Sequence, residues 1–361
     1  MGMNIVDPSK REFLKKAGLG AGLLAVGPGV LAACGDDDSS SAETTTTTTT
    51  TAAAPSLTKV GFQLGWVPSV QYGGSFIAQE RGYYTDEGLE VEIFPGGPNN
   101  PVDPTIVSGQ ALIGVGATDY AARANLEGAG YKIIGSKNQS HAFCITSLAD
   151  NPVENPQALE GGARIGVATI NQPVIDAIVA LNDLDVSLLN IVPTQGDPAP
   201  LINGEVDCFL TLFTTGPIDL ELQGFETSSW LLGEYGYQIF AGVNMVLEET
   251  LNDPEKRDLT KRLFKADLRG WHDWVDDIQY ATDITVNEYA ADQDLNPEQQ
   301  YLQAEAQRSL LVTPETEANG LFTMSAEKIA QNIETMSLLG VEIDESLFVT
   351  DMLDEIYAEG F

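Results

Sequence analysis

The sequence predicts an α/β protein of two lobes, each a mostly parallel sheet flanked by helices, with a cleft between the lobes. Strand-like and helix-like segments alternate through most of the chain, which is typical of parallel sheets connected by helical crossovers. The part of the chain after Pro55 is just over three hundred residues long. That length exceeds what one hydrophobic core usually serves, so two lobes are expected.

The first strand-helix-strand unit lies within residues 60–99. Segments 60–64 and 89–93 alternate apolar residues with polar or small ones, which is the period of a strand with two unlike faces. Between them, apolar residues at helical spacing predict a helix over 76–84. A crossover of this length makes the two strands parallel neighbours. Because ligands of open parallel sheets lie beyond the carboxyl ends of the strands, the loops after these strands should face one site.

Similar units follow in order along the chain. Two Asn-Pro pairs near residues 151–156 indicate a crossing point, after which a second series of strands and helices begins. Further strands are expected at 112–115, 131–135, 143–148, 164–167, 190–192 and 206–212, and helices at 259–275 and 325–338. The apolar segment 237–246 should return to the first lobe. The expected domains are lobe 1 over 57–149, lobe 2 over 150–242, and a return to lobe 1 with C-terminal helices over 243–361.

Residues 1–34 have the organisation of an export signal. Four basic residues precede a glycine-rich apolar run that is short for a bilayer span, and the run ends in Leu31-Ala32-Ala33-Cys34. This ending resembles the lipobox of bacterial lipoproteins, which implies a lipid on Cys34. We expect an exported protein, anchored by lipid at the periplasmic or extracellular face of the cell membrane, with residues 35–56 as a Thr-rich tether. Lys10 stands where twin-arginine signals usually have their first arginine, so general and twin-arginine export both stay open.

Acidic side chains dominate the composition. Asp and Glu together number 53 against 18 Lys and Arg, and the net charge is -35 at pH 7. Nucleic acid and anionic membrane surfaces would repel such a chain, so neither is an expected partner, and we expect a monomer. Solubility in a salty setting is the simpler interpretation of this acidity, and a cationic ligand is the alternative.

The cysteines and histidines predict neither a metal site nor a cofactor. Cys144 and Cys208 lie in apolar, strand-like segments, so buried thiols are favoured over the disulfide that an exported protein permits. His141 and His272 are the two histidines of the chain, and no cluster of metal-ligand residues accompanies them. His141 is interpreted as a structural residue.

A family resemblance runs from about residue 59 to about residue 338. Its motifs are Trp66-Val67-Pro68, Ala78-Gln79-Glu80-Arg81-Gly82-Tyr83-Tyr84, Glu87-Gly88-Leu89, Pro95-Gly96-Gly97-Pro98-Asn99 and Asn203-Gly204-Glu205-Val206-Asp207. With these motifs the chain resembles the periplasmic substrate-binding proteins of ABC importers. The branch is the one shared by alkanesulfonate, nitrate and riboflavin binders, thiamine-precursor binders, and the fungal enzyme that makes the thiamine pyrimidine. The resemblance implies the type II periplasmic binding protein fold, hinge motion at crossings near 148–152 and 241–245, and delivery of a small molecule to a membrane permease.

The chain departs from this family at its reactive positions. The resemblance implies a lysine for pyridoxal phosphate and a nearby histidine in the enzyme branch, but Gly116 and Tyr120 stand in the corresponding loop. We therefore expect a binding protein and no enzyme. A pyrimidine-synthase-type enzyme, a binder of sulfonate- or nitrate-class anions, and a ligand-sensing surface protein are the alternatives. The precursor-binding branch tends to have a glutamate where this chain has Thr214-Thr215-Gly216, which weakens the case for an aminopyrimidine.

The strand-end loops predict what the cleft binds. Loops 65–74, 95–101, 116–120, 168–173, 193–198 and 212–217 contain two carboxylates, Asp119 and Asp197, and no Lys or Arg. An anion would depend on backbone N–H groups there, so we expect a small, neutral or weakly cationic heterocycle of vitamin or thiamine-precursor type. Trp66 has a second interpretation as core, and Asp119 as a helix N-cap. The candidate ligand-binding residues are Trp66, Gln71, Tyr72, Asn99, Asp119, Tyr120, Asn171, Gln172, Phe213, Thr214 and Thr215.

Overall fold

The computed structural model describes residues 56–97 and 100–361. The predicted signal segment, the lipidation site at Cys34 and the tether as far as residue 55 lie outside the described residues, and so does Asn99. No helix within the described part of the chain is long and apolar enough to cross a membrane.

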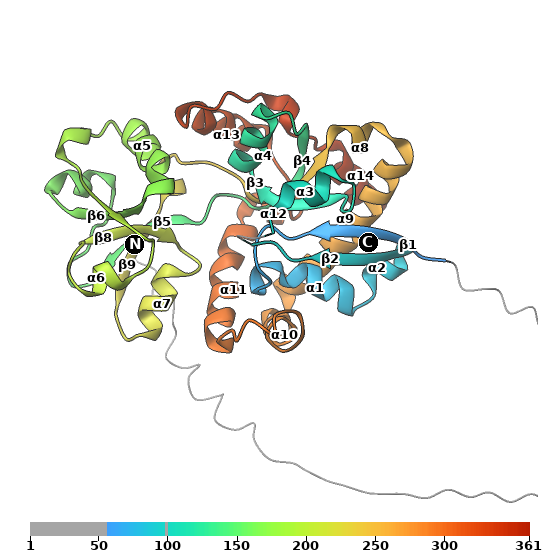
Figure 1. Cartoon of the computed structure of the whole chain (residues 1–361), viewed down its shortest axis with the longest axis horizontal. Coiled ribbons are helices and arrows are strands. Elements are labelled where there is room, and N and C mark those ends of the chain that lie inside the picture. Colours follow the sequence, from blue (N-terminus) through green and yellow to red (C-terminus); the bar gives the residue numbers. More distant parts are fainter. Residues whose placement is uncertain (1–55, 98–99) are drawn as a thin grey trace, which may run out of the picture. The chain divides into compact units, whose positions relative to one another are not determined.

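The described chain builds two five-stranded sheets (Figure 1). In the first sheet the strand order is β2-β1-β3-β10-β4, and in the second it is β7-β6-β8-β5-β9. One inner strand of each sheet, β10 in the first and β5 in the second, runs antiparallel to both of its neighbours. The strands are β1 (Thr58–Gln63), β2 (Leu89–Phe94), β3 (Ile113–Ala117), β4 (Tyr131–Asn138), β5 (Phe143–Leu148), β6 (Arg164–Ala168), β7 (Asn190–Thr194), β8 (Cys208–Leu212), β9 (Thr227–Leu231) and β10 (Ala241–Leu247).

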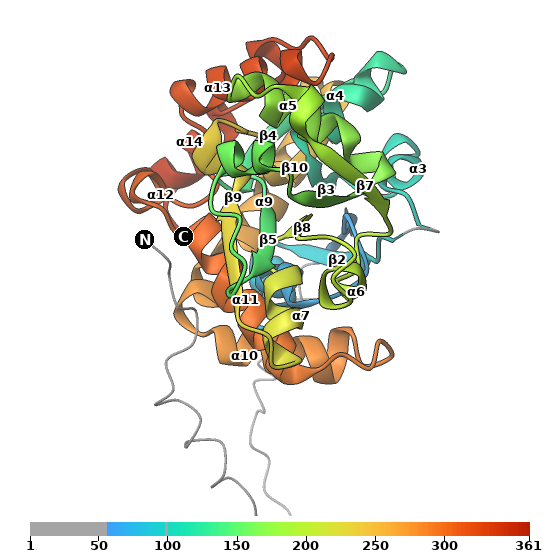
Figure 2. The same ribbon diagram turned by 90° about the vertical axis from the view of Figure 1, so that its left-hand side faces the viewer.

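Helices flank both sheets, as the sequence predicts for an α/β fold. Figure 2 views the second sheet and its helices from the side that lies at the left in Figure 1. Around the second sheet lie α5 (Gln172–Leu181), α6 (Ala199–Ile202) and α7 (Gly216–Leu222). The others are α1 (Gly73–Glu80), α2 (Tyr83–Asp86), α3 (Val102–Val107), α4 (Thr118–Leu126), α8 (Glu248–Asn252), α9 (Pro254–Asp276), α10 (Ile278–Ile284), α11 (Pro297–Leu311), α12 (Pro314–Asn319), α13 (Ala326–Leu338) and α14 (Asp351–Glu359). Short helical turns include η2 (Val70–Tyr72) and η6 (Leu232–Tyr235).

The two crossings between the sheets differ from the expected ones. Strand β5, which we expected at the end of lobe 1, pairs with β8 and β9 in the second sheet. The chain therefore passes from the first sheet to the second within residues 139–142, and it returns within residues 236–240. The sequence could not reveal this because β5 is largely buried on both faces, and periodicity does not tell which sheet such a strand joins.

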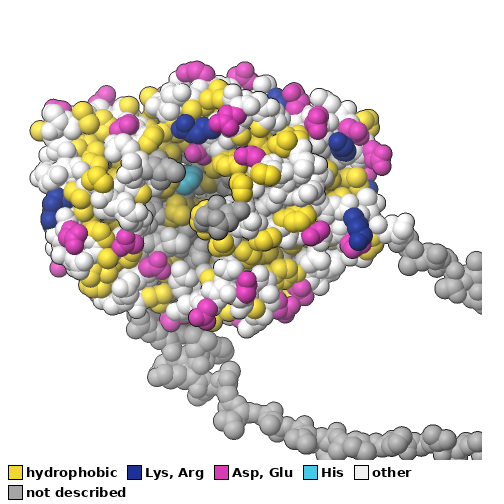
Figure 3. All heavy atoms as spheres, in the orientation of Figure 1, with side chains coloured by type: hydrophobic (Ala, Val, Ile, Leu, Met, Phe, Trp, Pro, Cys, Tyr) yellow, Lys and Arg dark blue, Asp and Glu magenta, His cyan; other side chains and the backbone are white. Residues whose placement is uncertain are grey.

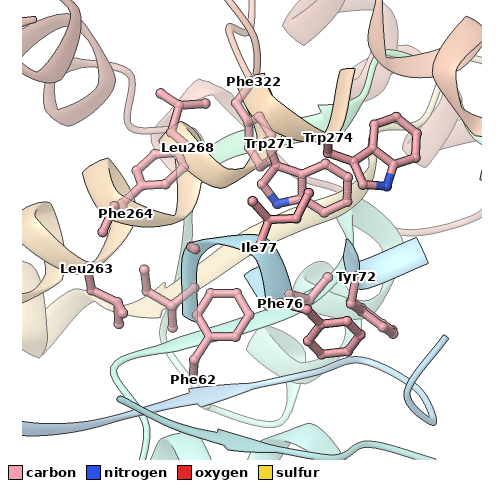
Figure 4. Close-up of a cluster of buried hydrophobic side chains, with 14 of the residues drawn as sticks. Phe62, Tyr72, Phe76, Ile77, Leu263, Phe264, Leu268, Trp271, Trp274 and Phe322 are labelled. Atoms are coloured by element: carbon pink, nitrogen blue, oxygen red, sulfur yellow. The ribbon is translucent and has the colours of Figure 1, made fainter. Parts of the chain in front are cut away.

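The largest core packs α1 and α9 against the first sheet (Figure 4). Helix α9 begins at Pro254 behind Asp253, whose side chain accepts two backbone N–H groups of the first turn. Its buried apolar stripe includes Leu263, Phe264, Leu268, Trp271 and Trp274, as the spacing predicts. Gly74 of α1 and Gly270 of α9 let the two helices touch, because a Cβ at either position would overlap atoms of the opposite helix. This contact fixes the helix that follows the first strand-end loop.

The basic residues of α9 are largely paired within the chain. Arg257 lies 2.7 Å from Glu355 and Lys261 lies 2.7 Å from Glu359, both on α14. Arg269 contacts Asp86 at 3.3 Å, which ties α9 to α2. A surface interspersed with acidic partners is what the sequence predicts for this helix. These pairs occupy the cations that a docking surface would have to offer.

Candidate ligand-binding pocket

A cavity of about 360 Å³ lies at the carboxyl ends of the first-sheet strands. Figure 3 shows a hollow in this face of the molecule, with hydrophobic side chains around it. The cavity is lined by Gly65, Trp66, Gln71, Tyr72, Val102, Val115, Gly116, Ala117, Asp119, Tyr120, Lys137, Asn138, His141, Ala142, Leu212, Thr214, Ala241, Gly242 and Gln307. Both sheets and the connecting segment 139–142 therefore contribute to one pocket.

Trp66 follows strand β1 and presents a large aromatic face to this cavity. Its side chain is 50 % exposed, whereas Tyr72 is only 4 % exposed and belongs to the core. The loop before Trp66 is held close to the sheet because Gly65 packs on the carbonyl of Val115, where a Cβ would lie at 2.5 Å. Trp66 is therefore available to stack on a ligand, while Tyr72 forms the wall behind it.

The first turn of α4 supplies a carboxylate and a phenol. The N-cap position of this helix is Ala117, so Asp119 is not the cap that one interpretation of the sequence proposed. No hydrogen bond joins the Asp119 side chain to any described residue, and its carboxylate lines the cavity. The Tyr120 hydroxyl donates to Asp103 Oδ2 at 2.8 Å, so Tyr120 offers the cavity its ring and not its proton.

A buried lysine at the end of strand β4 lines the same cavity. Lys137 is 4 % exposed, and its Nζ donates to the carbonyl of Gln71 at 2.5 Å. The ammonium lies 4.7 Å from the ring centre of Trp271 and 5.5 Å from that of Tyr72. Burial lowers the pKa of Lys137 to about 7, and the charge of Asp267 opposes part of that shift.

The backbone of β10 makes room for this lysine. Gly242 sits at an irregularity in the pairing of β10 with β3, with φ of +62°. A Cβ there would lie 2.7 Å from Cε of Lys137, and L-residues with side chains rarely adopt this φ. Gly242 is therefore the position across which the Lys137 side chain lies.

Asp267 of α9 is the carboxylate whose negative charge acts on Lys137 and raises its pKa. It is 1 % exposed, and its Oδ1 accepts the Tyr84 hydroxyl at 2.9 Å, whereas Oδ2 has no hydrogen-bond partner in the described chain. Burial raises the pKa of Asp267 to about 6. The described ion pairs do not include one between Lys137 and Asp267. Asp267 therefore acts on Lys137 through its charge at a distance and not through a direct contact.

His141 lines the cavity from the connecting segment. Its Nδ1 accepts the backbone N–H of Phe143 at 3.2 Å, and the imidazole stacks on the Phe143 ring with centres 3.9 Å apart. Burial lowers the pKa of His141 to about 4, with Asp119 opposing part of the shift. A neutral ring whose Nδ1 accepts a hydrogen bond carries its proton on Nε2.

The second sheet contributes less to the cavity than the sequence predicts. Thr214 lines the cavity, but Phe213 and Thr215 do not. Thr215 bonds instead to the Leu212 carbonyl at 3.4 Å, and Gln172 bonds to Asp176 within α5. Asn171 lines a neighbouring cavity of about 620 Å³ that also includes Asp119 and Tyr120.

No metal or disulfide site accompanies the pocket in the described chain. Residues 56–97 and 100–361 contain no group of three His, Cys, Asp or Glu side chains that could hold a metal ion. Cys144 and Cys208 are both free and buried, which confirms the favoured interpretation. Burial raises the pKa of both thiols to about 12, so they stay protonated at neutral pH.

Comparison with known proteins places the chain in a family. The profile of the family described as NMT1/THI5 like matches residues 69–281, which is more than half of the sequence. The chain belongs to the NMT1/THI5 like family. This assignment agrees with the branch that the sequence motifs indicate.

Two proteins with named functions are similar in sequence to this NMT1/THI5 like chain. The 4-amino-5-hydroxymethyl-2-methylpyrimidine phosphate synthase of Schizosaccharomyces pombe is 29 % identical over 189 residues, covering 50 % of each chain. The formylaminopyrimidine-binding protein of Halalkalibacterium halodurans is 22 % identical over 235 residues, covering 63 % of this chain and 70 % of that protein. The chain thus spans about half the length of the yeast synthase it matches.

The fold of this NMT1/THI5 like chain is that of the periplasmic binding proteins. The putative periplasmic sulfonate-binding protein SsuA of Methylobacillus flagellatus KT matches it with a TM-score of 0.61 at 15 % identity, over 85 % of this chain and 96 % of that one. The expected fold class is therefore confirmed.

Sequence reasoning placed six of its candidates around the cavity of about 360 Å³ and missed others. Those brought together are Trp66, Gln71, Tyr72, Asp119, Tyr120 and Thr214. Lys137, Asn138 and Gln307 were missed because they lie in a strand and a helix, and a search of strand-end loops does not include them. Lys137 lies between Ser136 and Asn138 in a strand that also contains Lys132, so the sequence carried no distinctive signal for it. The absence of cations from the predicted loops was therefore an incomplete guide to the charge of the pocket.

Proposed function

We propose that this protein is a substrate-binding lipoprotein of an ABC importer, which captures a small heterocycle and delivers it to a permease. The observation that carries the proposal is the single cavity lined by Trp66, Asp119 and Thr214, which come from loops of two separate sheets. Its volume of about 360 Å³ is in the range of small-molecule sites. The fold and the family membership support the same function.

The ligand in this proposal is flat and neutral or weakly cationic. Trp66 and Tyr120 offer aromatic rings, and Gln71 and Thr214 offer polar groups. The charged residues of the lining are Asp119 and Lys137, while His141 is neutral at pH 7. The Lys137 pKa of about 7 leaves this amine only partly charged at pH 7, so the lining has no excess positive charge and the pocket favours a neutral or weakly cationic ligand over an anion.

Capture would close the pocket by rotation about the two crossings. Segments 139–142 and 236–240 are the two backbone connections between the sheets. Two short connections are the arrangement from which hinge closure around a ligand is built. The lipid on Cys34 and the tether 35–56 would keep the protein near its permease, as the sequence predicts.

A synthase of the kind found in S. pombe is the rival function. The resemblance implies a cofactor lysine near the end of β3, but Gly116 stands there, and a Cβ at this position would lie 2.6 Å from Cε of Met245. The residues present therefore do not fit pyridoxal phosphate at that place. Recovery of a pyridoxal adduct on any lysine after borohydride trapping would overturn the binding-protein proposal.

Tryptophan fluorescence tests the proposal directly. Trp66 is half exposed, whereas Trp230, Trp271 and Trp274 are nearly fully buried, so a ligand in the cavity should change mainly the Trp66 signal. We expect a saturable change with at least one member of a panel of pyrimidines, flavins, sulfonates and amines, and loss of that change in Trp66→Phe. Micromolar affinity corresponds to about 8 kcal/mol. Calorimetry that finds no saturable binding across the whole panel would count against the proposal.

A further inference from the structure

Three polar groups of the cavity wall have unused hydrogen-bonding capacity. The Lys137 ammonium has three N–H donors, and the described chain takes one of them through Gln71. Asn138 is 9 % exposed, and its Oδ1 is buried without a partner among the described residues. The Asp119 carboxylate, which is partly exposed, also lacks a side-chain hydrogen bond within the described chain. Buried polar groups are normally satisfied, so Lys137 and Asn138 call for a ligand, and Asp119 is free to bind the same ligand.

Lys137 is held in place by the structure around it. Its side chain lies across Gly242 and faces the rings of Trp271 and Tyr72, and the residue is 4 % exposed. Asp267, whose charge acts on Lys137, makes no described ion pair with it. A buried charge without a bonded counterpart is costly, and an oxygen acceptor on the ligand would relieve that cost.

Asp119 and Asn138 require hydrogen-bond donors from the ligand, whereas Lys137 requires an acceptor. Both present oxygen atoms that accept hydrogen bonds and cannot be satisfied by a carbonyl or an anion. A ligand that carried acceptors alone would meet repulsion from Asp119. A ligand that carried donors alone would leave Lys137 unsatisfied.

We infer that the pocket selects a dipolar, net-neutral ring, with an acceptor oxygen that binds Lys137 and an N–H donor that binds Asp119 and Asn138. This inference rests on the proposed binding function and names the ligand class of the same site. Trp66 then stacks on the face of the ring. Recognition by both edges gives stronger discrimination than the ring face alone, since a missing donor or acceptor leaves a buried group unpaired.

Four small probes separate the two edges. Cytosine has a carbonyl acceptor and N–H donors. 4-Aminopyrimidine keeps an amino donor and its ring nitrogens but has no carbonyl, 1-methyl-2-pyrimidinone has the carbonyl but no N–H, and pyrimidine has neither a carbonyl nor an N–H. We expect cytosine to bind the wild-type chain about ten- to a hundred-fold more tightly than 4-aminopyrimidine or 1-methyl-2-pyrimidinone, as one hydrogen bond to a charged group implies. Calorimetry or Trp66 fluorescence measures the four affinities. Equal affinities for all four in the wild-type chain would overturn the inference without any variant.

Two variants assign the edges to residues. Lys137→Met should remove the advantage of cytosine over 4-aminopyrimidine, and Asp119→Asn should reduce its advantage over 1-methyl-2-pyrimidinone. Lys132→Met on the same strand, whose Nζ bonds to the Ser346 carbonyl, and Asp197→Asn, which lies outside the cavity, should change neither ratio. Persistence of both ratios in the two pocket variants would overturn the assignment.

Failure of this inference is distinguishable from failure of the proposed function. If another compound of the panel binds but none of the four probes does, the dipolar-ring class is wrong and the binding function stands. If no compound binds the wild-type chain, the binding function itself falls and this inference with it. A thermal unfolding curve for each variant separates a lost contact from a lost fold.

Discussion

The Tyr84 hydroxyl donates a hydrogen bond of 2.9 Å to Asp267, and this bond joins α2 to α9, whose Asp267 carboxylate acts on the charge of Lys137. The Tyr84 hydroxyl therefore helps to position the Asp267 carboxylate, and the charge of that carboxylate acts on the Lys137 side chain. Lys137 lines the ligand pocket and Asp267 is buried on α9, so the charge of each influences the protonation of the other.

The stability of the protein should depend on pH through Lys137. Burial lowers its folded-state pKa to about 7 from the ordinary value of 10.5, so between these two values the unfolded chain binds more protons than the folded chain. The stabilising contribution is full above pH 10.5 and is lost as pH falls towards 7. Relative to Lys137→Met, the wild-type free energy of unfolding should rise with pH in this window, by up to about 1.4 kcal/mol per pH unit.

Urea unfolding of both chains at pH 7, 8.5 and 10 measures this difference. The comparison with Lys137→Met cancels the titration of the other lysines and tyrosines, which both chains share. Curves that stay parallel across the three values would show that Lys137 keeps its proton in the folded state.

Replacement of Trp66 by alanine should weaken ligand binding and leave stability almost unchanged. The side chain is half exposed, so its removal takes little apolar surface out of the core. Loss of aromatic stacking should lower affinity about tenfold for whichever panel compound binds. Leu188→Ala, at an exposed position outside the cavity, is the control for removal of a large apolar side chain. Wild-type affinity in Trp66→Ala would mean that the ligand does not contact this ring.

Replacement of Gly74 by alanine should destabilise the protein. The added methyl group would overlap the ring of Trp271, which is 2 % exposed and cannot move away freely. Overpacking of this kind costs about 1–3 kcal/mol, which outweighs the gain of up to about 1 kcal/mol in helix propensity. Gly161→Ala is the matched control because a Cβ there meets no atom within 4 Å. Equal midpoints of urea unfolding for the two variants would contradict the close approach of α1 and α9.

Salt should stabilise the protein. Asp and Glu number 53 against 18 Lys and Arg, so repulsion between carboxylates acts over the whole surface and weakens as salt screens it. Screening also weakens the exposed pairs of α9, such as Lys261 with Glu359, but exposed ion pairs contribute little to stability. The melting temperature should therefore rise between 0.05 and about 2 M sodium chloride. Scanning calorimetry that found a fall would show that the ion pairs outweigh the repulsion.

The sequence predicted those site residues whose positions depend on local structure, such as the end of a strand. Trp66 and Asp119 each follow a strand of the first sheet, and strand ends of a parallel sheet share one edge. Lys137 could not be found by the same rule because it lies within β4, and its access to the cavity depends on a glycine more than a hundred residues later. Phe213 and Thr215 also follow a strand, but the turn that begins α7 directs them elsewhere. Such placements depend on tertiary packing, which periodicity does not encode.

The inner position of β10 has a consequence for the order of assembly. This strand lies between β3 and β4, yet it is made only after the whole of the second sheet. A chain emerging from its N-terminus therefore holds a complete set of strands for the second sheet while the first sheet still lacks the strand that joins β3 to β4. The lobe that begins first is finished last, and its binding pocket, which needs Gly242, cannot exist until that late strand is inserted.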